Sequence, residues 1–119
     1  MNAKEELLRK IADIQKFMEG TQLRCATISH EPFGYWLDDD YKPKPIELKL
    51  GYTPSELKEF LNSLDFDYDN GYGSQQLFGT VWFTNGIWMD RYEYDGSEHW
   101  DIHKYPGIPI ELCTVHIID

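Results

Sequence analysis

The side chains best placed to do chemistry in this sequence are Asp90, His99, Asp101 and His103. Alternate residues of a β-strand point to the same side of a sheet, so His99, Asp101 and His103 can line one face of a strand. With Asp90 on a neighbouring strand, they have the ligand types of a divalent-metal site or of a His–Asp acid–base pair. The pattern includes no serine or cysteine nucleophile. It suggests a metal-binding module or a small metal-dependent enzyme, with a solvated polar face as the alternative.

A second acidic motif, Asp65-x-Asp67-x-Asp69, resembles the first half of a calcium-binding loop. An EF-hand loop requires glycine at its sixth position and a bidentate glutamate at its twelfth. This sequence has Asn70 and Gln76 at those positions, and no helical pattern follows. The motif therefore predicts an acidic turn after a helix rather than a calcium site.

Negative charge is concentrated in one part of the chain, whose formal net charge is −10. Between residues 59 and 103 the only base is Arg91. This balance argues against direct binding of nucleic acid or anionic lipid, since both need a basic surface. Acids interleaved with aromatic residues favour a surface that binds a basic protein, and the alternative is an acidic surface kept for solubility. The residues expected to form the binding surface are Asp65, Asp67, Asp69, Trp88, Asp90, Tyr92, Glu93, Tyr94, Asp95, Glu98 and Asp101.

Length and composition predict a single domain with one hydrophobic core, because the chain has 119 residues and 41% of them are apolar. No apolar run approaches membrane-spanning length. The charged start at residues 4–10 is unlike a secretory signal, so we expect a cytoplasmic protein. Cys25 and Cys113 lack the spacing of a zinc site or redox dithiol, which favours free thiols, and no motif indicates a cofactor.

Periodicity predicts an α+β domain over residues 1–119, in which an antiparallel sheet with a C-terminal β-meander packs against two helices. Asn2 and Gly20 suit the ends of the first helix, and Thr53 to Glu56 has the form of a capping box. The aromatic segment 31–45, rich in proline and glycine, is expected to cover the core. The predicted helices are 3–19 and 53–63. The sheet is expected to contain four to six strands. The candidate strands are 22–30, 46–50, Gln76–Thr84, Ile87–Tyr94, Ser97–Tyr105 and Glu111–Ile118.

Asn85-Gly86 and Asp95-Gly96 both suit two-residue type I′ turns, which fix the register of a hairpin. The first turn would place Phe83 opposite Trp88, and the second would place Asp90 opposite Asp101. One face would then carry Trp82, Met89, Ile102, Trp100, Arg91, Glu93 and Glu98. The other would carry Val81, Phe83, Trp88, Asp90, Tyr92, Tyr94, His99, Asp101 and His103.

These faces predict two specific interactions. Arg91 should lie on the ring of Trp100 as a cation–π pair. Asp90 and Asp101 are like charges in directly opposed positions, which is unfavourable in an isolated ladder. His99 and His103 on the same face are expected to compensate for that repulsion.

The stretch from Gly79 to Trp100, GTVWFTNGIWMDRYEYDGSEHW, resembles small acidic uncharacterised proteins of phages and mobile elements. Such proteins often pair a Trp-rich Asn-Gly hairpin with a Tyr-Asp-Gly-Ser-Glu turn. The resemblance implies a context in which small acidic proteins inhibit host defence, some of them as DNA mimics against CRISPR effectors or restriction enzymes. It covers about a fifth of the chain and assigns no residue a role.

Taken together, these features predict a non-enzymatic acidic binding protein that occupies the nucleic-acid-binding surface of a basic partner. A metal-binding module or small enzyme using Asp90, His99, Asp101 and His103 is the alternative from a different class. An immunity protein that neutralises a basic toxin would share the same electrostatics. A homo-oligomer that holds a small ligand between aromatic rings is a further alternative.

Overall fold

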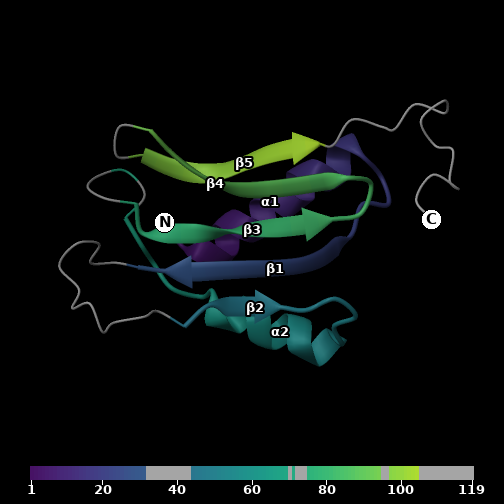
Figure 1. Ribbon diagram of the computed structural model, residues 1–119, viewed down its shortest axis with the longest axis horizontal. Helices are drawn as coiled ribbons and strands as arrows, with labels where there is room; N and C mark the ends of the chain where they lie inside the picture. Colours follow the sequence, from purple (N-terminus) through teal and green to yellow (C-terminus); the bar gives the residue numbers. More distant parts are fainter. Residues whose placement is uncertain (32–43, 70, 72–74, 95–96, 105–119) are drawn as a thin grey trace, which may run out of the picture.

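The computed structural model describes residues 1–31, 44–69, 71, 75–94 and 97–104. Its elements form one antiparallel sheet in the order β2-β1-β3-β4-β5, with both helices behind the strands in Figure 1. The predicted α+β class is confirmed. In chain order the elements are α1 (Ala3–Phe17), β1 (Leu23–His30), β2 (Ile46–Leu48), α2 (Pro54–Ser63), β3 (Leu77–Phe83), β4 (Ile87–Tyr94) and β5 (Ser97–Lys104).

Several predictions fall on residues outside those ranges. They are the covering role of the segment 32–43, the turn at Asp95-Gly96, the strand Glu111–Ile118 and the thiol of Cys113. Cys25 is a free thiol, as predicted, and is half-buried in β1. No helix within the described residues is long and apolar enough to cross a membrane.

The helix starts follow the predicted capping. The side chain of Asn2 accepts a hydrogen bond from the Glu5 N–H at 2.9 Å and begins α1. Thr53 and Glu56 form a reciprocal capping box at α2, with their two hydrogen bonds at 2.9 and 3.2 Å. α1 ends at Phe17, earlier than predicted, because Met18 leaves the helical conformation.

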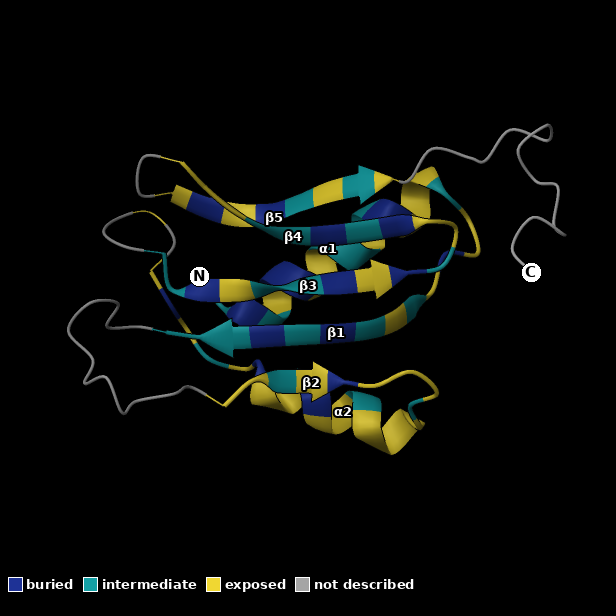
Figure 2. Cartoon of the chain, in the orientation of Figure 1, coloured by how far each residue is buried: buried dark blue, intermediate teal, exposed yellow. Residues whose placement is uncertain are grey.

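The core lies between the sheet and the two helices. Alternate residues of the strands are buried, as Figure 2 shows along β3 and β4. Each large side chain buried in this way stabilises the fold by about 1.5–3 kcal/mol. The principal core residues are Leu7 and Ile14 of α1, Phe60 of α2, Ile28 of β1, Val81 of β3, Met89 of β4 and Trp100 of β5.

The predicted register of the first hairpin is wrong by one residue. Trp82 lies opposite Trp88, so Val81 and Phe83 face the core and Trp82 takes the other face. Asn85 has the positive φ of a type I′ turn, but β3 reaches that turn with one extra residue, Thr84.

At this turn, Thr84 pairs with a residue that is distant in the sequence. The Thr84 N–H donates to the Gln22 carbonyl at 2.9 Å, and the Thr84 hydroxyl accepts from the Gln22 N–H at 2.8 Å. The Ile87 N–H also donates to the Thr84 carbonyl across the Asn85-Gly86 turn, with the two atoms 3.4 Å apart. Thr84 therefore closes the turn and also pairs with Gln22 ahead of β1, and the one-residue difference in register lies between this turn and the Trp82–Trp88 pair.

The predicted register of the second hairpin is confirmed along its full length. Asp90 lies opposite Asp101, Arg91 opposite Trp100, and Tyr92 opposite His99. Alternate residues of β4 and β5 consequently face opposite ways. The side chains of one set face the helices, and those of the other set face away from them.

Candidate functional site

Figure 1 shows the strands in front of the helices, so one side of the sheet is turned away from them. This side, here called the open face, carries the aromatic and ionisable residues of β3, β4 and β5. Tyr92 is 47% exposed and Tyr94 71% exposed, so both rings are accessible to a partner. The open-face residues of these strands are Phe78, Thr80 and Trp82 of β3, Trp88, Asp90, Tyr92 and Tyr94 of β4, and His99, Asp101 and His103 of β5.

Three of the four predicted metal-site residues meet on this face. His103 Nε2 lies 2.8 Å from Asp90 Oδ1 and 3.5 Å from Asp101 Oδ2. One ligand atom from each residue lies within 4.8 Å of the others, and all three side chains are half-buried. The fourth predicted residue, His99, packs against Tyr92 with ring centroids 5.4 Å apart. We call Asp90, Asp101 and His103 the open-face triad.

Trp88 lies beside the open-face triad. Its ring stacks on that of His103, with centroids 4.2 Å apart and planes 26° apart. Stacking of this kind restricts rotation of the imidazole. It therefore helps to hold His103 Nε2 toward both carboxylates.

The opposite side of the same two strands holds a buried charge cluster, which consists of Glu6, Tyr68, Arg91 and Glu98. Arg91 donates to Glu6 at 3.1 Å, to Glu98 at 2.7 Å and to the Tyr68 hydroxyl at 2.8 Å. The Tyr68 hydroxyl in turn donates to Glu6. The Arg91 guanidinium also lies 5.0 Å from the centroid of the Trp100 ring, which confirms the predicted cation–π pair.

Glu98 was predicted to belong to the binding surface, and the structure contradicts this. Its side chain is 1% exposed, and its carboxylate also accepts hydrogen bonds from the backbone N–H groups of Gln76 and Leu77 at 2.7 and 3.0 Å. A carboxylate with this many donors is stable in the interior. Glu98 is therefore an internal anchor between β5 and the start of β3.

The cluster has a marked effect on Tyr68. Burial raises the pKa of the phenol, and its hydrogen bond to Glu6 raises that pKa further. Tyr68 therefore stays neutral and can serve both as donor to Glu6 and as acceptor from Arg91. Two carboxylates thus share one guanidinium inside the cluster. Sequence reasoning missed Glu6 and Tyr68, although the hairpin register already placed Arg91 and Glu98 on one face.

The predicted acidic turn lies at one end of the sheet. Phe66 stacks on His30, the last residue of β1, at 4.4 Å, and this places the turn beside that strand end. Asp65 accepts from the Asn2 side chain at 3.0 Å, and Asp67 forms a β-bridge with Asn2. Asp65, Asp67, Asp69 and Glu93 are all exposed and form what we call the acidic end.

Exposed carboxylates gather at one end of the sheet, beside the Met1 ammonium, which donates to the Tyr68 carbonyl. His30 pairs with Leu77 at the acidic end, and Tyr94 pairs with Ser97 there too. The exposed bases Arg24 and Lys104 lie at the opposite ends of β1 and β5. Of the predicted binding residues, Asp95 lies outside the described residues. Asp65, Asp67, Asp69, Glu93, Tyr92 and Tyr94 are accessible toward one end of the sheet.

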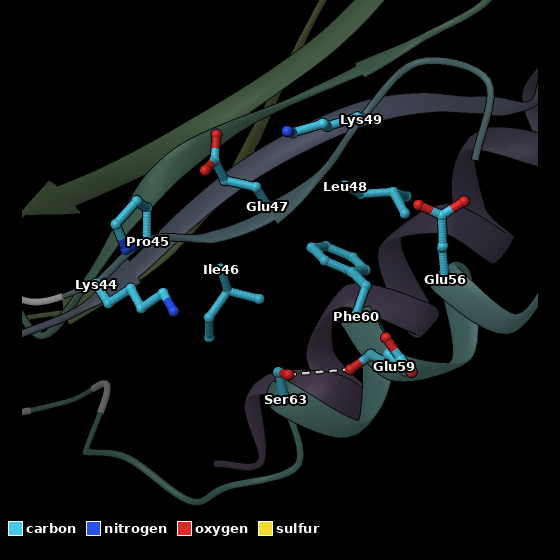
Figure 3. A pocket seen from close by; sticks show the side chains of 10 residues that line it. All are labelled: Lys44, Pro45, Ile46, Glu47, Leu48, Lys49, Glu56, Glu59, Phe60 and Ser63. Carbon is cyan, nitrogen blue, oxygen red and sulfur yellow. Dashed lines mark hydrogen bonds between the residues drawn. The ribbon is translucent and has the colours of Figure 1, made fainter. Parts of the chain in front are cut away.

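The surface also has a hollow of about 470 Å³ between α2 and the edge strand β2 (Figure 3). Phe60, Ile46 and Leu48 form its apolar part. Lysines from the β2 segment and glutamates from both elements line the rest, so the charges are mixed. Its lining includes no histidine or cysteine and shows none of the convergence seen in the open-face triad.

Comparisons of the chain with protein-family models, with curated proteins and with solved structures give no match.

Proposed function

We propose that this protein is a non-enzymatic binding protein whose acidic end and adjoining tyrosines engage a basic surface of another protein. The observation that carries the proposal is the position of four exposed carboxylates at the sheet end where Tyr92 and Tyr94 are accessible. Tyrosines are frequent anchors of protein interfaces, because they combine a large apolar ring with a polar tip.

Charge supports a basic partner. The acidic end carries Asp65, Asp67, Asp69 and Glu93, whereas Arg24 and Lys104 lie at the other end of the sheet. Such an asymmetry orients an approaching protein and increases its association rate with a positive surface. Nucleic-acid-binding proteins present large positive surfaces of this kind.

The narrower form of the proposal is an inhibitor that occupies the nucleic-acid-binding surface of a host defence protein. Its support is the combination of net charge −10 with the resemblance of residues 79–100 to small acidic phage proteins. A partner bound in this way cannot hold nucleic acid at the same time, so the two ligands must compete.

The experiment is a pull-down from bacterial lysate, eluted in salt steps, with a variant in which Asp65, Asp67 and Asp69 are changed to Asn. The matched control removes three exposed carboxylates elsewhere, through Glu19→Gln, Glu47→Gln and Glu59→Gln. If each carboxylate contributes about 0.5–1 kcal/mol, the first variant weakens binding roughly 10- to 100-fold.

The proposal expects a basic partner that elutes at modest salt and is displaced by short duplex DNA. It also expects the partner to be lost from the aspartate variant and kept by the control. Equal loss from both variants would indicate that only net charge matters and would contradict a defined surface. Retention that is insensitive to salt would contradict the electrostatic part of the proposal.

A further inference from the structure

We propose that the open-face triad of Asp90, Asp101 and His103 is a binding site for a divalent transition-metal ion of the zinc type. The inference goes beyond partner binding at the acidic end, because it uses a different set of residues on β4 and β5. It rests on ligand geometry, on the rigidity of the strands that carry the ligands, and on the chemistry of the donor atoms.

The geometry is close to that of a bound ion. Ligand atoms about 2.0–2.1 Å from a tetrahedral Zn²⁺ lie about 3.3–3.4 Å from one another. His103 Nε2 and Asp101 Oδ2 are already 3.5 Å apart, and all three ligand atoms lie within 4.8 Å of one another. The hydrogen-bonded pair His103 Nε2 and Asp90 Oδ1, at 2.8 Å, needs to open by roughly half an ångström. The Asp90 and Asp101 oxygens, at most 4.8 Å apart, would have to approach each other.

The ligands are held in place by independent contacts. Asp90 and Asp101 are opposed in a ladder that is paired from Ile87 to Tyr94, so their backbones cannot slide apart. Trp88 stacks on the His103 ring and limits its rotation. A site whose ligands are held by surrounding packing loses less entropy on binding the ion than a site on a loop.

The site also relieves an unfavourable arrangement. Asp90 directly faces Asp101, and such like-charge pairs destabilise a strand pair. A divalent cation between them converts the repulsion into two favourable interactions. His103 alone can offset at most one of the two negative charges.

The donor set selects the class of ion. Two carboxylate oxygens and one imidazole nitrogen suit zinc, cobalt, nickel or manganese, whereas calcium and magnesium prefer oxygen ligands alone. Three protein ligands also leave at least one coordination position open to water or to a group from another molecule. The geometry therefore points to an open-sided site rather than a closed structural one.

The test is calorimetric titration of tag-free, EDTA-treated full-length protein with Zn²⁺, supported by the visible absorption of bound Co²⁺. We expect saturable binding of one ion per chain and a higher melting temperature with Zn²⁺. Asp90→Asn, Asp101→Asn and His103→Gln should each weaken binding about tenfold or more. His99→Gln is the matched control, because His99 lies on the same strand and face but packs against Tyr92.

Each variant is first melted without metal, so that a loss of binding can be separated from a loss of folding. A folded His103→Gln variant that binds Zn²⁺ as tightly as the wild type would overturn the proposal, as would equal weakening by His99→Gln. Absence of binding in the wild type at millimolar Zn²⁺ would overturn it too. Binding of Mg²⁺ as tight as that of Zn²⁺ would show that the imidazole is not a ligand.

Discussion

Replacement of the buried Arg91 side chain should strongly destabilise the sheet. In the native fold, the Arg91 side chain is 1% exposed and pairs with Glu6 and Glu98, whose side chains are 9% and 1% exposed. Arg91→Met keeps much of the apolar volume but leaves two buried carboxylates without their cation. Breaking a buried ion pair from one side costs about 3–5 kcal/mol.

That cost is a large part of the total stability of a small domain, which is about 5–15 kcal/mol. For a chain of this size, about 3–5 °C of melting temperature corresponds to each kcal/mol, so a decrease of roughly 10–20 °C is expected. Urea unfolding followed by circular dichroism measures the free energy directly and shows whether the variant keeps the native unfolding slope.

A double-mutant cycle separates the ion pair from the packing of the arginine stem. Glu98→Gln alone should cost about 1–3 kcal/mol, because the amide has one acceptor oxygen for donors that bond to both carboxylate oxygens, and Arg91 loses a charged partner. In the double variant Arg91→Met with Glu98→Gln, the two losses should not add, because the stranded charge of Glu98 is gone. A loss below about 1 kcal/mol for Arg91→Met, or strict additivity in the cycle, would refute this description of the cluster.

Three further predictions follow from individual residues. The raised pKa of Tyr68 means that the folded state holds the phenolic proton more tightly than the unfolded chain does. The stabilising contribution of this proton is therefore complete below pH 10 and decreases as the pH rises above that value. Urea unfolding between pH 8 and 11 should show this decrease in the free energy of unfolding, at most about 1.4 kcal/mol per pH unit. Tyr68→Phe should reduce the dependence of that free energy on pH, and an unchanged dependence would contradict the role of Tyr68. Gly79→Ala should destabilise the fold by roughly 1–3 kcal/mol, because Gly79 has a φ of +151° and an added Cβ would lie 2.3 Å from the Thr27 carbonyl oxygen. A melting temperature equal to that of the wild type would argue against this close approach. Tyr94→Ala should leave the melting temperature nearly unchanged, since the ring is 71% exposed, but should weaken capture of the basic partner about tenfold or more, and unaltered capture would remove Tyr94 from the proposed surface.

The sequence predicted the elements well where local signals define them. Asn2 and the capping box of Thr53 begin the two helices, and alternation marks β3, β4 and β5. The register of β4 with β5 was also predictable, because the connection is short and both strands are regular. That register is what placed Asp90 opposite Asp101 and brought the open-face triad together.

The failures have a common physical origin in contacts between distant parts of the chain. Thr84 follows β3 and pairs with Gln22, a residue 62 positions away in the sequence, and the register of β3 with β4 differs by one residue from the predicted one. Glu98 is buried because Arg91 and the backbone at Leu77 stabilise it, and another partner of Arg91, Glu6, lies in the first helix. A local pattern rule has no access to these partners, so it assigns an acidic residue near a turn to the surface.

Alternation along β4 and β5 therefore places two charge clusters back to back. Arg91 and Glu98 point inward and fix the hairpin to α1 and to the start of β3, whereas Asp90 and Asp101 point outward. In the inward cluster a single guanidinium faces two carboxylates.

The same two strands therefore carry a buried arginine cluster on one side and the open-face triad on the other. The inward contacts hold the hairpin against α1, and the outward residues are positioned by that fixed backbone.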